Sequence, residues 1–301
     1  MLWFTRRHKI TGGNVYASKG PPNIVNGQSA CRGVGTVIDW EHLQIDPVAQ
    51  IEANLLQVKQ RFKVDESVEK IEPVALVAYG HTLHETWPQI AEYKTIFTCS
   101  GAHKFLLKRG VQPTFHVESD PQSHKKTMLG PPCSSTQYLI ASIVDPAYVS
   151  LLLSVLPDSQ ITLWHILCYD PPILKVLPSR EPLITGGDTV GPRMMKIAKL
   201  MGYRNMHFFG FDACADPLTN QTHADVHPKP KAFKLESYEF NDKDYVVRED
   251  WLVHAETMLD DLDRLPEVKY RFHGTNSLLR EMAEAHVPVK RARLPLFMEK
   301  G

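Results

Sequence analysis

Short apolar runs alternate with stretches of helical periodicity over most of this chain. Each run ends in small or polar residues, as at 74–78, which Tyr79 and Gly80 follow. Runs of this length are typical of buried strands in a parallel sheet whose two faces are covered by helices. Strands are expected at 74–78, 95–99, 114–118, 138–142, 161–165, 206–210 and 268–272. Their alternation with helices predicts an α/β fold with a mostly parallel sheet flanked by helices.

Helical spacing of apolar residues is clear in the segments between these runs. Over 44–70, Ile51, Leu55, Val58 and Phe62 recur every three or four residues, which predicts a helix. Further helices are expected at 83–93, 102–109, 146–156, 190–201, 251–265 and 277–285. The stretch 190–201 is amphipathic and is followed by Gly202, the residue that most often terminates a helix.

Two stretches lack a sustained period. Residues 1–40 are rich in Gly, Asn, Ser and Pro and predict an irregular arm, and the polar stretch 213–245 predicts a long loop or lid insertion. We therefore divide the chain into an N-terminal arm and helix over 1–70, one α/β domain over 71–290 and a tail over 291–301.

The overall composition excludes several classes of protein. The 301 residues carry 34 Lys and Arg against 34 Asp and Glu, so binding to nucleic acid by net charge alone is not expected. No apolar run approaches the 18 or so residues of a membrane span. The five cysteines form no C-x-x-C pair, which argues against a disulfide framework or a structural zinc site. A cytoplasmic location, in a bacterium or a phage-infected cell, is the expectation.

Small and polar residues gather at the carboxyl ends of the expected strands, where α/β sheets bind ligands. Glycine there lets a backbone approach a ligand, and a carboxylate can hold a ribose hydroxyl, a base edge or a metal. A single aspartate can equally cap a loop. The candidate binding residues at this edge are Tyr79, Gly80, Ser100, Asp120, Gly210 and Asp212.

A glycine-bearing turn precedes the helix expected at 190–201. Thr185, Gly186 and Gly187 stand where backbone N–H groups and a helix N-terminus could hold an anion. The stretch is neither a Walker A loop nor a G-x-G-x-x-G motif. A tight turn with a helix cap is the alternative interpretation.

Three titratable residues alternate within the expected lid. His223, Asp225 and His227 would point the same way in an extended segment. No further ligand stands at a recognisable zinc spacing, so no metal site is expected. The favoured interpretation is that one histidine contacts a phosphate or transfers a proton.

Several of these segments resemble the 6-hydroxymethylpterin diphosphokinase MptE-like family, which includes flagellin-modifying motility accessory factors and phage-encoded proteins. The resemblance covers roughly 73–290, with blocks at 79–83, 97–102, 106–121, 185–191 and 200–212 and weaker motifs at His223 and 251–255. The order of motifs is also similar to that of bacterial CMP-sialic-acid-dependent sialyltransferases, where such turns surround CMP. The resemblance implies a Rossmann-like, nucleotide-binding transferase domain over 71–290.

The chain departs from these families at particular positions. Their first turn usually reads Gly-Pro-Ser-Leu, whereas this chain has Gly80, His81, Thr82 and Leu83. The tyrosines that assist phosphate departure in the sialyltransferases correspond to about Cys214 and His223. Their base histidine has no direct match, although His254 lies a few residues away.

The resemblance implies a transferase that moves a sugar from a nucleotide-activated, CMP-linked or similar donor to a hydroxyl acceptor. The nucleotide sugar is then a substrate and no resident cofactor is expected. Catalysis is assigned to His223, His254 and Asp225, and nucleotide binding to Tyr79, Gly80, Ser100, Asp120, Thr185, Gly186, Gly187, Gly210 and Asp212.

Two alternatives remain open at this stage. One is an ATP-dependent pyrophosphokinase acting on a hydroxymethyl group, with Mg²⁺ held by Asp120, Asp212 and Asp225. The other is a catalytically inactive, nucleotide-binding accessory protein. The acceptor, whether glycan, protein or modified nucleic acid, and the oligomeric state are not indicated by the sequence.

Overall fold

The computed structural model describes residues 40–168, 170–186, 189–225, 234–286 and 297–299. Residues 1–39 of the arm expected over 1–40, Gly187, His227 and most of the tail over 291–301 lie outside the described residues. Within them, no helix combines the length and apolar character that a membrane span requires.

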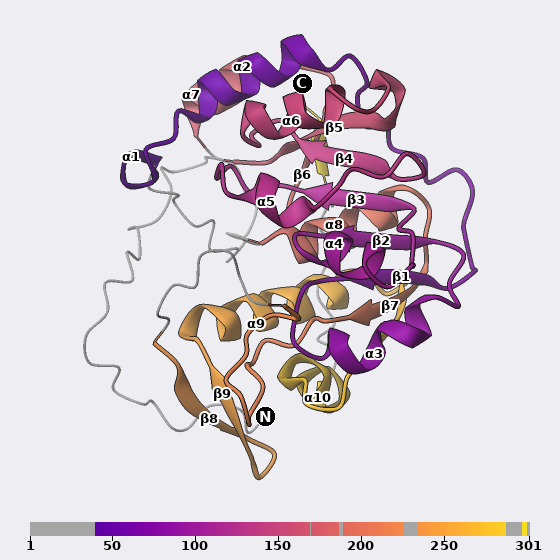
Figure 1. Cartoon of the computed structure of the whole chain (residues 1–301), viewed down its shortest axis with the longest axis vertical. Helices are drawn as coiled ribbons and strands as arrows, with labels where there is room; N and C mark the ends of the chain where they lie inside the picture. Colours follow the sequence, from indigo (N-terminus) through magenta and orange to yellow (C-terminus); the bar gives the residue numbers. More distant parts are fainter. Residues whose placement is uncertain (1–39, 169, 187–188, 226–233, 287–296, 300–301) are drawn as a thin grey trace, which may run out of the picture.

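A single large sheet lies at the centre of the described chain (Figure 1). Its nine strands follow the order β10-β7-β1-β2-β3-β4-β5-β6-β11. All neighbours are parallel except β11 and β6. The strands are β1 (Val74–Val77), β2 (Ile96–Cys99), β3 (Phe115–Glu118), β4 (Gln137–Ala141), β5 (Ile161–Ile166), β6 (Pro182–Ile184), β7 (Asn205–Phe209), β10 (Lys269–Phe272) and β11 (Phe297–Glu299). The mostly parallel, Rossmann-like α/β fold is therefore confirmed.

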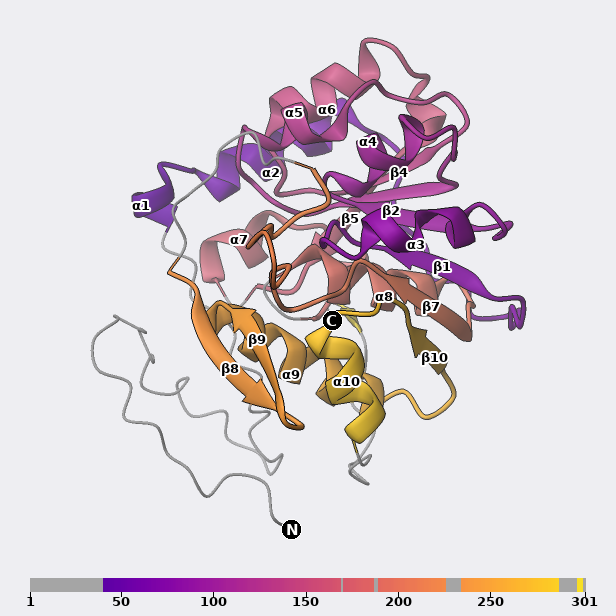
Figure 2. The ribbon, with the colours of Figure 1, turned by 60° about the horizontal axis from the view of Figure 1, so that its bottom comes forward.

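Helices cover both faces of this sheet (Figure 2). Ala75 and Val77 point toward α3 (Leu83–Ile90) and α4 (Ala102–Leu107), whereas Val74 and Leu76 share a core with α8 (Val190–Leu200) and α9 (Glu249–Asp263). This alternation follows from the period of two along a strand. The other helices are α1 (Trp40–Leu43), α2 (Pro47–Gln57), α5 (Lys125–Leu129), α6 (Pro146–Leu153), α7 (Pro171–Val176), α10 (Leu278–Ala285) and a 3₁₀ turn at Asp158–Gln160.

The direction in which successive strands are added to the sheet reverses at β1. From β1 the chain proceeds through β2 to β6 on one side, and α8 then returns it to β7 on the other side of β1. The carboxyl ends of β1 and β7 therefore form the topological switch point, where open α/β sheets bind ligands.

The helix expected over 44–70 is wrong beyond Gln57, where α2 ends. Val58 and Phe62 are buried, as their spacing suggests, but in an extended segment. Phe62 N donates to Leu163 O at 2.8 Å, and Leu163 N donates to Gln60 O at 3.0 Å. Pairing with β5 thus overrides the helical period of this segment.

The stretch 213–245 is not a simple loop, because it contains most of a β-hairpin. Strands β8 (Glu236–Phe240) and β9 (Lys243–Val247) pair antiparallel. The two turn residues, Asn241 and Asp242, have φ of 50° and 59°, the left-handed values that a two-residue hairpin turn requires. Residues 226–233 of the expected lid lie outside the described chain.

Candidate functional site

The turns that follow β1 and β7 pack directly on each other. Gly80 N donates to Gly210 O at 2.9 Å, and Gly210 has a left-handed φ of 66°. A β-carbon on Gly80 would lie 2.3 Å from Asp212 Oδ2 and 2.5 Å from Gly210 O. The predicted glycines are therefore brought together, and their missing side chains allow two protein turns to meet.

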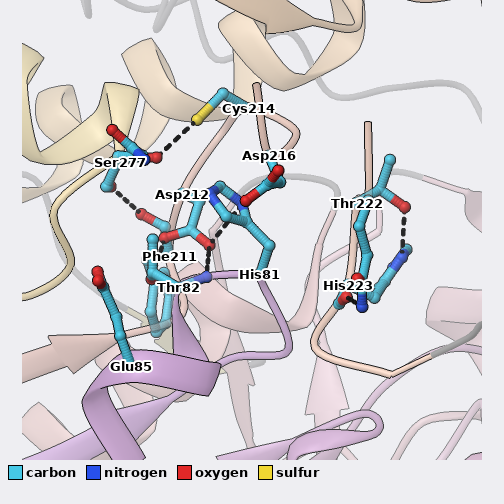
Figure 3. A network of polar contacts seen from close by, with 12 residues as sticks. His81, Thr82, Glu85, Phe211, Asp212, Cys214, Asp216, Thr222, His223 and Ser277 are labelled. Carbon is cyan, nitrogen blue, oxygen red and sulfur yellow. Dashed lines mark hydrogen bonds and ion pairs between the residues drawn. The ribbon is translucent and has the colours of Figure 1, made fainter. Parts of the chain in front are cut away.

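Asp212 joins these turns to the start of α3 (Figure 3). Its carboxylate is 3% exposed and accepts bonds from Thr82 N at 2.9 Å and Thr82 Oγ1 at 2.6 Å. His81 Nδ1 lies 3.2 Å from Asp212 Oδ2. Burial raises the pKa of Asp212, while His81 and the Thr82 bonds offset part of that rise. Gly274, which follows β10, packs against Thr82, since a β-carbon on Gly274 would lie 2.7 Å from Thr82 Oγ1.

A second group forms around Tyr79. The ring of Tyr79 lies over Gly101, where a β-carbon would be 2.3 Å from the ring, and its centroid is 5.5 Å from that of His223. Burial raises the pKa of Tyr79 to about 12, and the charge of Asp225 adds to the rise. Asp225 also pairs with Lys108 at 3.4 Å. The structure thus brings Tyr79, His223 and Asp225 together, beside Ser100.

The N-terminus of α8 reaches the same edge of the sheet. A β-carbon on Gly191, in the first turn, would lie 2.8 Å from the ring of Phe211, which follows β7. Arg193 Nη1 donates to Ser119 Oγ at 3.2 Å, so this turn also touches the end of β3. Segments after β3 and β7 therefore meet at one helix N-terminus.

Two buried cations on α8 were not expected from the sequence. Arg193 is 8% exposed and Lys196 4%. Lys196 Nζ lies 3.3 Å from Thr185 Oγ1 and 2.8 Å from Asp261 Oδ2, and its stem passes beneath Gly186. Burial lowers the pKa of Lys196, against the opposing charge of Asp261. The sequence did contain a signal for these buried cations, because Arg193 and Lys196 are charged residues three positions apart on a helix whose other buried positions are apolar.

The other candidates make contacts of their own. Asp120 forms an ion pair with Lys125 at 3.0 Å, and its N–H donates to buried Glu118. His254 is half-buried on α9, on the opposite face of the sheet from α3. Asp120, Asp212 and Asp225 each have a separate set of partners, so their carboxylates do not form one ligand set. In the segments that the structure describes, no three His, Cys, Asp or Glu side chains are grouped to hold a metal ion.

Two pockets flank the segment that follows β10. One, of about 240 Å³, is lined by residues that include Glu85, Arg271 and Arg280. The other, of about 290 Å³, is lined by residues that include Lys243, Tyr245 and Asn276. Neither was expected from the sequence, because the chain segments that line them are far apart in number.

Comparison with known proteins agrees with this architecture. The family model for 6-hydroxymethylpterin diphosphokinase MptE-like proteins matches residues 49–217. The solved MAf glycosyltransferase from Magnetospirillum magneticum AMB-1 is similar to 76% of the chain, with 16% identity and a TM-score of 0.53. The likeness covers 36% of that protein, so this chain spans about a third of its length.

A mammalian sialyltransferase in complex with Gal-beta-1-3GalNAc-ortho-nitrophenol is more distant. It matches with 14% identity and a TM-score of 0.43, over 78% of this chain and 84% of that one. No curated protein matches the sequence at a significant level. At these identities, the likeness to the MAf enzyme shows a shared fold. Because the family model spans more than half of the chain, the chain belongs to the 6-hydroxymethylpterin diphosphokinase MptE-like family.

Proposed function

We propose that this protein is a nucleotide-dependent glycosyltransferase, which moves a sugar from a nucleotide-activated donor to a hydroxyl acceptor. The observation that carries the proposal is the pair of buried cations on α8, with Arg193 in its first turn and Lys196 in its second turn, near Thr185. A helix N-terminus and buried positive charge both favour a phosphate group. Backbone N–H groups near Thr185 and Gly186 would hold the donor phosphate beside them.

The neighbouring strand ends suit the nucleoside. Ser100 and Asp120 follow β2 and β3, next to Ser119, which already contacts Arg193. Hydroxyl and carboxylate groups at these positions would bind ribose or base, as at the switch points of other α/β sheets. A CMP-linked donor is the first to test, because of the order of motifs, and the name of the similar MAf glycosyltransferase supports sugar transfer.

The chemistry of such a site depends mainly on positioning. Glycosyl transfer needs a held donor phosphate, an aligned acceptor hydroxyl and exclusion of water. The segment between β7 and β9, which includes His223 beside Tyr79, would cover the donor. His223 or His254 would stabilise the departing phosphate.

The family description also suggests a diphosphokinase, for which Mg²⁺ is normally required. The described carboxylates do not fit that requirement. Asp120 is paired with Lys125, Asp212 is bonded to Thr82, and Asp225 is paired with Lys108. Three separate partners leave no shared position for a cation, and this favours sugar transfer.

The test combines binding and turnover. The purified protein is screened by thermal shift with CMP, UDP, GDP and ATP, and by donor hydrolysis or transfer with the corresponding nucleotide sugars. We expect one nucleotide class to stabilise the fold and its sugar to turn over without added Mg²⁺. Strict Mg²⁺ dependence with AMP release would instead assign the diphosphokinase, and tight binding without turnover the accessory protein. If no nucleotide stabilises the fold and no nucleotide sugar of the panel is turned over, nucleotide dependence is refuted.

A variant pair sharpens the test. Lys196→Met should weaken nucleotide binding at least about tenfold, since a hydrogen bond to a charged group contributes about 1.5–3 kcal/mol. Lys175→Met, at an exposed position of α7, is the control and should leave the affinity unchanged. Equal nucleotide affinities of the two variants would show that Lys196 does not contribute to phosphate binding.

A further inference from the structure

His81 occupies a buried position between two carboxylates at the switch point. The side chain is 6% exposed, and Figure 3 shows its ring between Asp212 and Asp216. Nδ1 lies 3.2 Å from Asp212 Oδ2. Asp216 lies close enough to His81 for the imidazole to affect the pKa of its carboxyl group. Partial burial alone would raise it, but bonds from Thr219 and Leu218, together with the charge of His81, lower it overall.

Neither ring nitrogen of His81 makes a hydrogen bond with a described residue, although both are buried. Nδ1 has the ion-pair contact with Asp212, whereas Nε2 has no charged partner among the described residues. An unsatisfied buried polar atom costs about 1–3 kcal/mol, so such atoms are rare outside functional or strained sites.

Asp212 determines what Nε2 can do. The bonds from Thr82 N and Thr82 Oγ1 fix the orientation of the carboxylate. A carboxylate beside Nδ1 favours the tautomer with its proton on Nδ1, which leaves a lone pair on Nε2. An imidazole oriented in this way is the usual arrangement for accepting a proton from a hydroxyl.

We propose that His81, oriented by Asp212, takes the proton of the acceptor hydroxyl in the reaction. This inference rests on the proposed function and deepens it. The acceptor oxygen forms a bond to the anomeric carbon of the donor, and the bond from that carbon to the donor phosphate oxygen breaks. The electron pair leaves with the nucleotide phosphate, and the hydroxyl proton moves to Nε2 and then to solvent.

Other features of the chain favour His81 over the two histidines named from the sequence. His223 directs Nδ1 to Thr222 Oγ1 at 2.7 Å, and His254 lies on α9. His81 stands in the turn at the carboxyl end of β1 and so places a titratable group at the switch point.

Access to Nε2 requires the segment that carries Asp216 to move. Hydrogen bonds within this segment hold it in a local turn, because Asp216 Oδ1 accepts hydrogen bonds from Leu218 N and Thr219 N. Its tip is solvated, with Leu218 91% exposed, and Ala213 at its start has a left-handed φ of 54°. Solvated tips of this kind open at a low free-energy cost, and we expect an acceptor to displace this one.

The kinetic test uses His81→Gln, with His84→Gln on the exposed side of α3 as the matched control. With the donor found active, His81→Gln should lower kcat about 10²- to 10⁴-fold and abolish its dependence on a group that must be deprotonated. The donor Kd should stay within about twofold, and the thermal midpoint near that of the parent. Full activity in folded His81→Gln with an unchanged pH profile would overturn the assignment and leave the proposed function standing.

A spectroscopic readout separates this inference from the function itself. Long-range ¹H–¹⁵N correlation of ring-labelled protein reports the tautomer of His81 without any substrate. We expect the proton on Nδ1, and its transfer to Nε2 in Asp212→Asn. A proton on Nε2 in the parent protein overturns the orientation by Asp212, whichever donor is or is not turned over. Absence of nucleotide binding and turnover would count against the function alone.

Discussion

Gly80 and Asp212 lie so close that a β-carbon on the glycine would come within 2.3 Å of the carboxylate oxygen Oδ2. The contact links the turn after β1 to the turn after β7, although 130 positions separate Thr82 from Asp212 in sequence. The switch point of the sheet is thus closed by protein groups at its base.

Replacement of Gly80 by alanine should destabilise the protein by about 3 kcal/mol, the upper part of the range for overpacking in a rigid site. Gly110→Ala is the control, because Gly110 has a positive φ of 75° but no atom within 4 Å of the position that a β-carbon would take. It should cost only about 1 kcal/mol, from backbone strain. Urea unfolding of both variants compares them, and equal losses would show that the contact with Asp212 relaxes freely.

Stability should fall as the pH is lowered from about 6.5, because two buried histidines resist protonation. Burial lowers the pKa of His103 to about 4 and that of His116 well below its ordinary value. The unfolded chain, with histidine pKa values near 6.5, then binds more protons than the folded one. Stability is fully present above about pH 6.5 and is lost progressively toward the folded-state pKa values, by up to about 1.4 kcal/mol per pH unit for each histidine.

The measurement is the free energy of unfolding between pH 5 and 7, in the parent and in His103→Gln. Burial also lowers the pKa of His207 and His273, and the variant removes one member of this set of histidines, so its slope against pH should be shallower. His84→Gln, on the exposed side of α3, should keep the parent slope. Parallel curves for all three proteins would mean that His103 is protonated in the folded state.

Replacement of one partner of the buried ion pair between Lys196 and Asp261 should destabilise the protein strongly. Among the described residues, Lys196→Met leaves Arg264, 3.6 Å away, as the one cation paired with buried Asp261. We expect a loss of about 3–5 kcal/mol, as for other uncompensated buried charges. Lys196→Met combined with Asp261→Leu should recover most of it. A double-mutant cycle by chemical denaturation measures the coupling, and additive losses would contradict it.

The hairpin turn offers a stabilising change. Asn241 and Asp242 both adopt left-handed backbone angles, a conformation that glycine adopts without strain. Asp242→Gly should therefore raise the free energy of unfolding by about 0.5–1 kcal/mol. Asp244→Gly, within β9, should lower it instead. Destabilisation by Asp242→Gly would show that the aspartate side chain contributes more than its strained backbone costs.

The sheet could be predicted from sequence because each parallel strand is a short apolar run followed by a turn. The failures have physical causes. Val58 and Phe62 keep a helical spacing, but the pairing of their segment with Leu163 lies outside any local pattern. The strand β6 has only three residues, too few to give a signal against the prolines around it.

The meeting of Gly80, Gly210 and Asp212 at one edge of the sheet could be predicted from sequence, while their role in binding stays a prediction. Their partners could not be read from the chain. Whether Asp212 faces a ligand or Thr82 depends on the crossover that returns α8 and β7 to β1. Lys196 was overlooked because a lysine in an amphipathic helix normally indicates the solvated side. His81 was not among the predicted site residues, because only the fold places its ring beside Asp212.

The anchoring of Thr82 has a consequence for selectivity. Turns after β1, β7 and β10 all contact this one threonine or its carboxylate partner. Under the proposed function, a donor that docks on them would cost little conformational entropy of the protein, because these contacts are made before it arrives. Discrimination among donors would then depend on shape at an ordered base, and the neighbouring segment that carries Asp216 would supply the rearrangement that the acceptor requires.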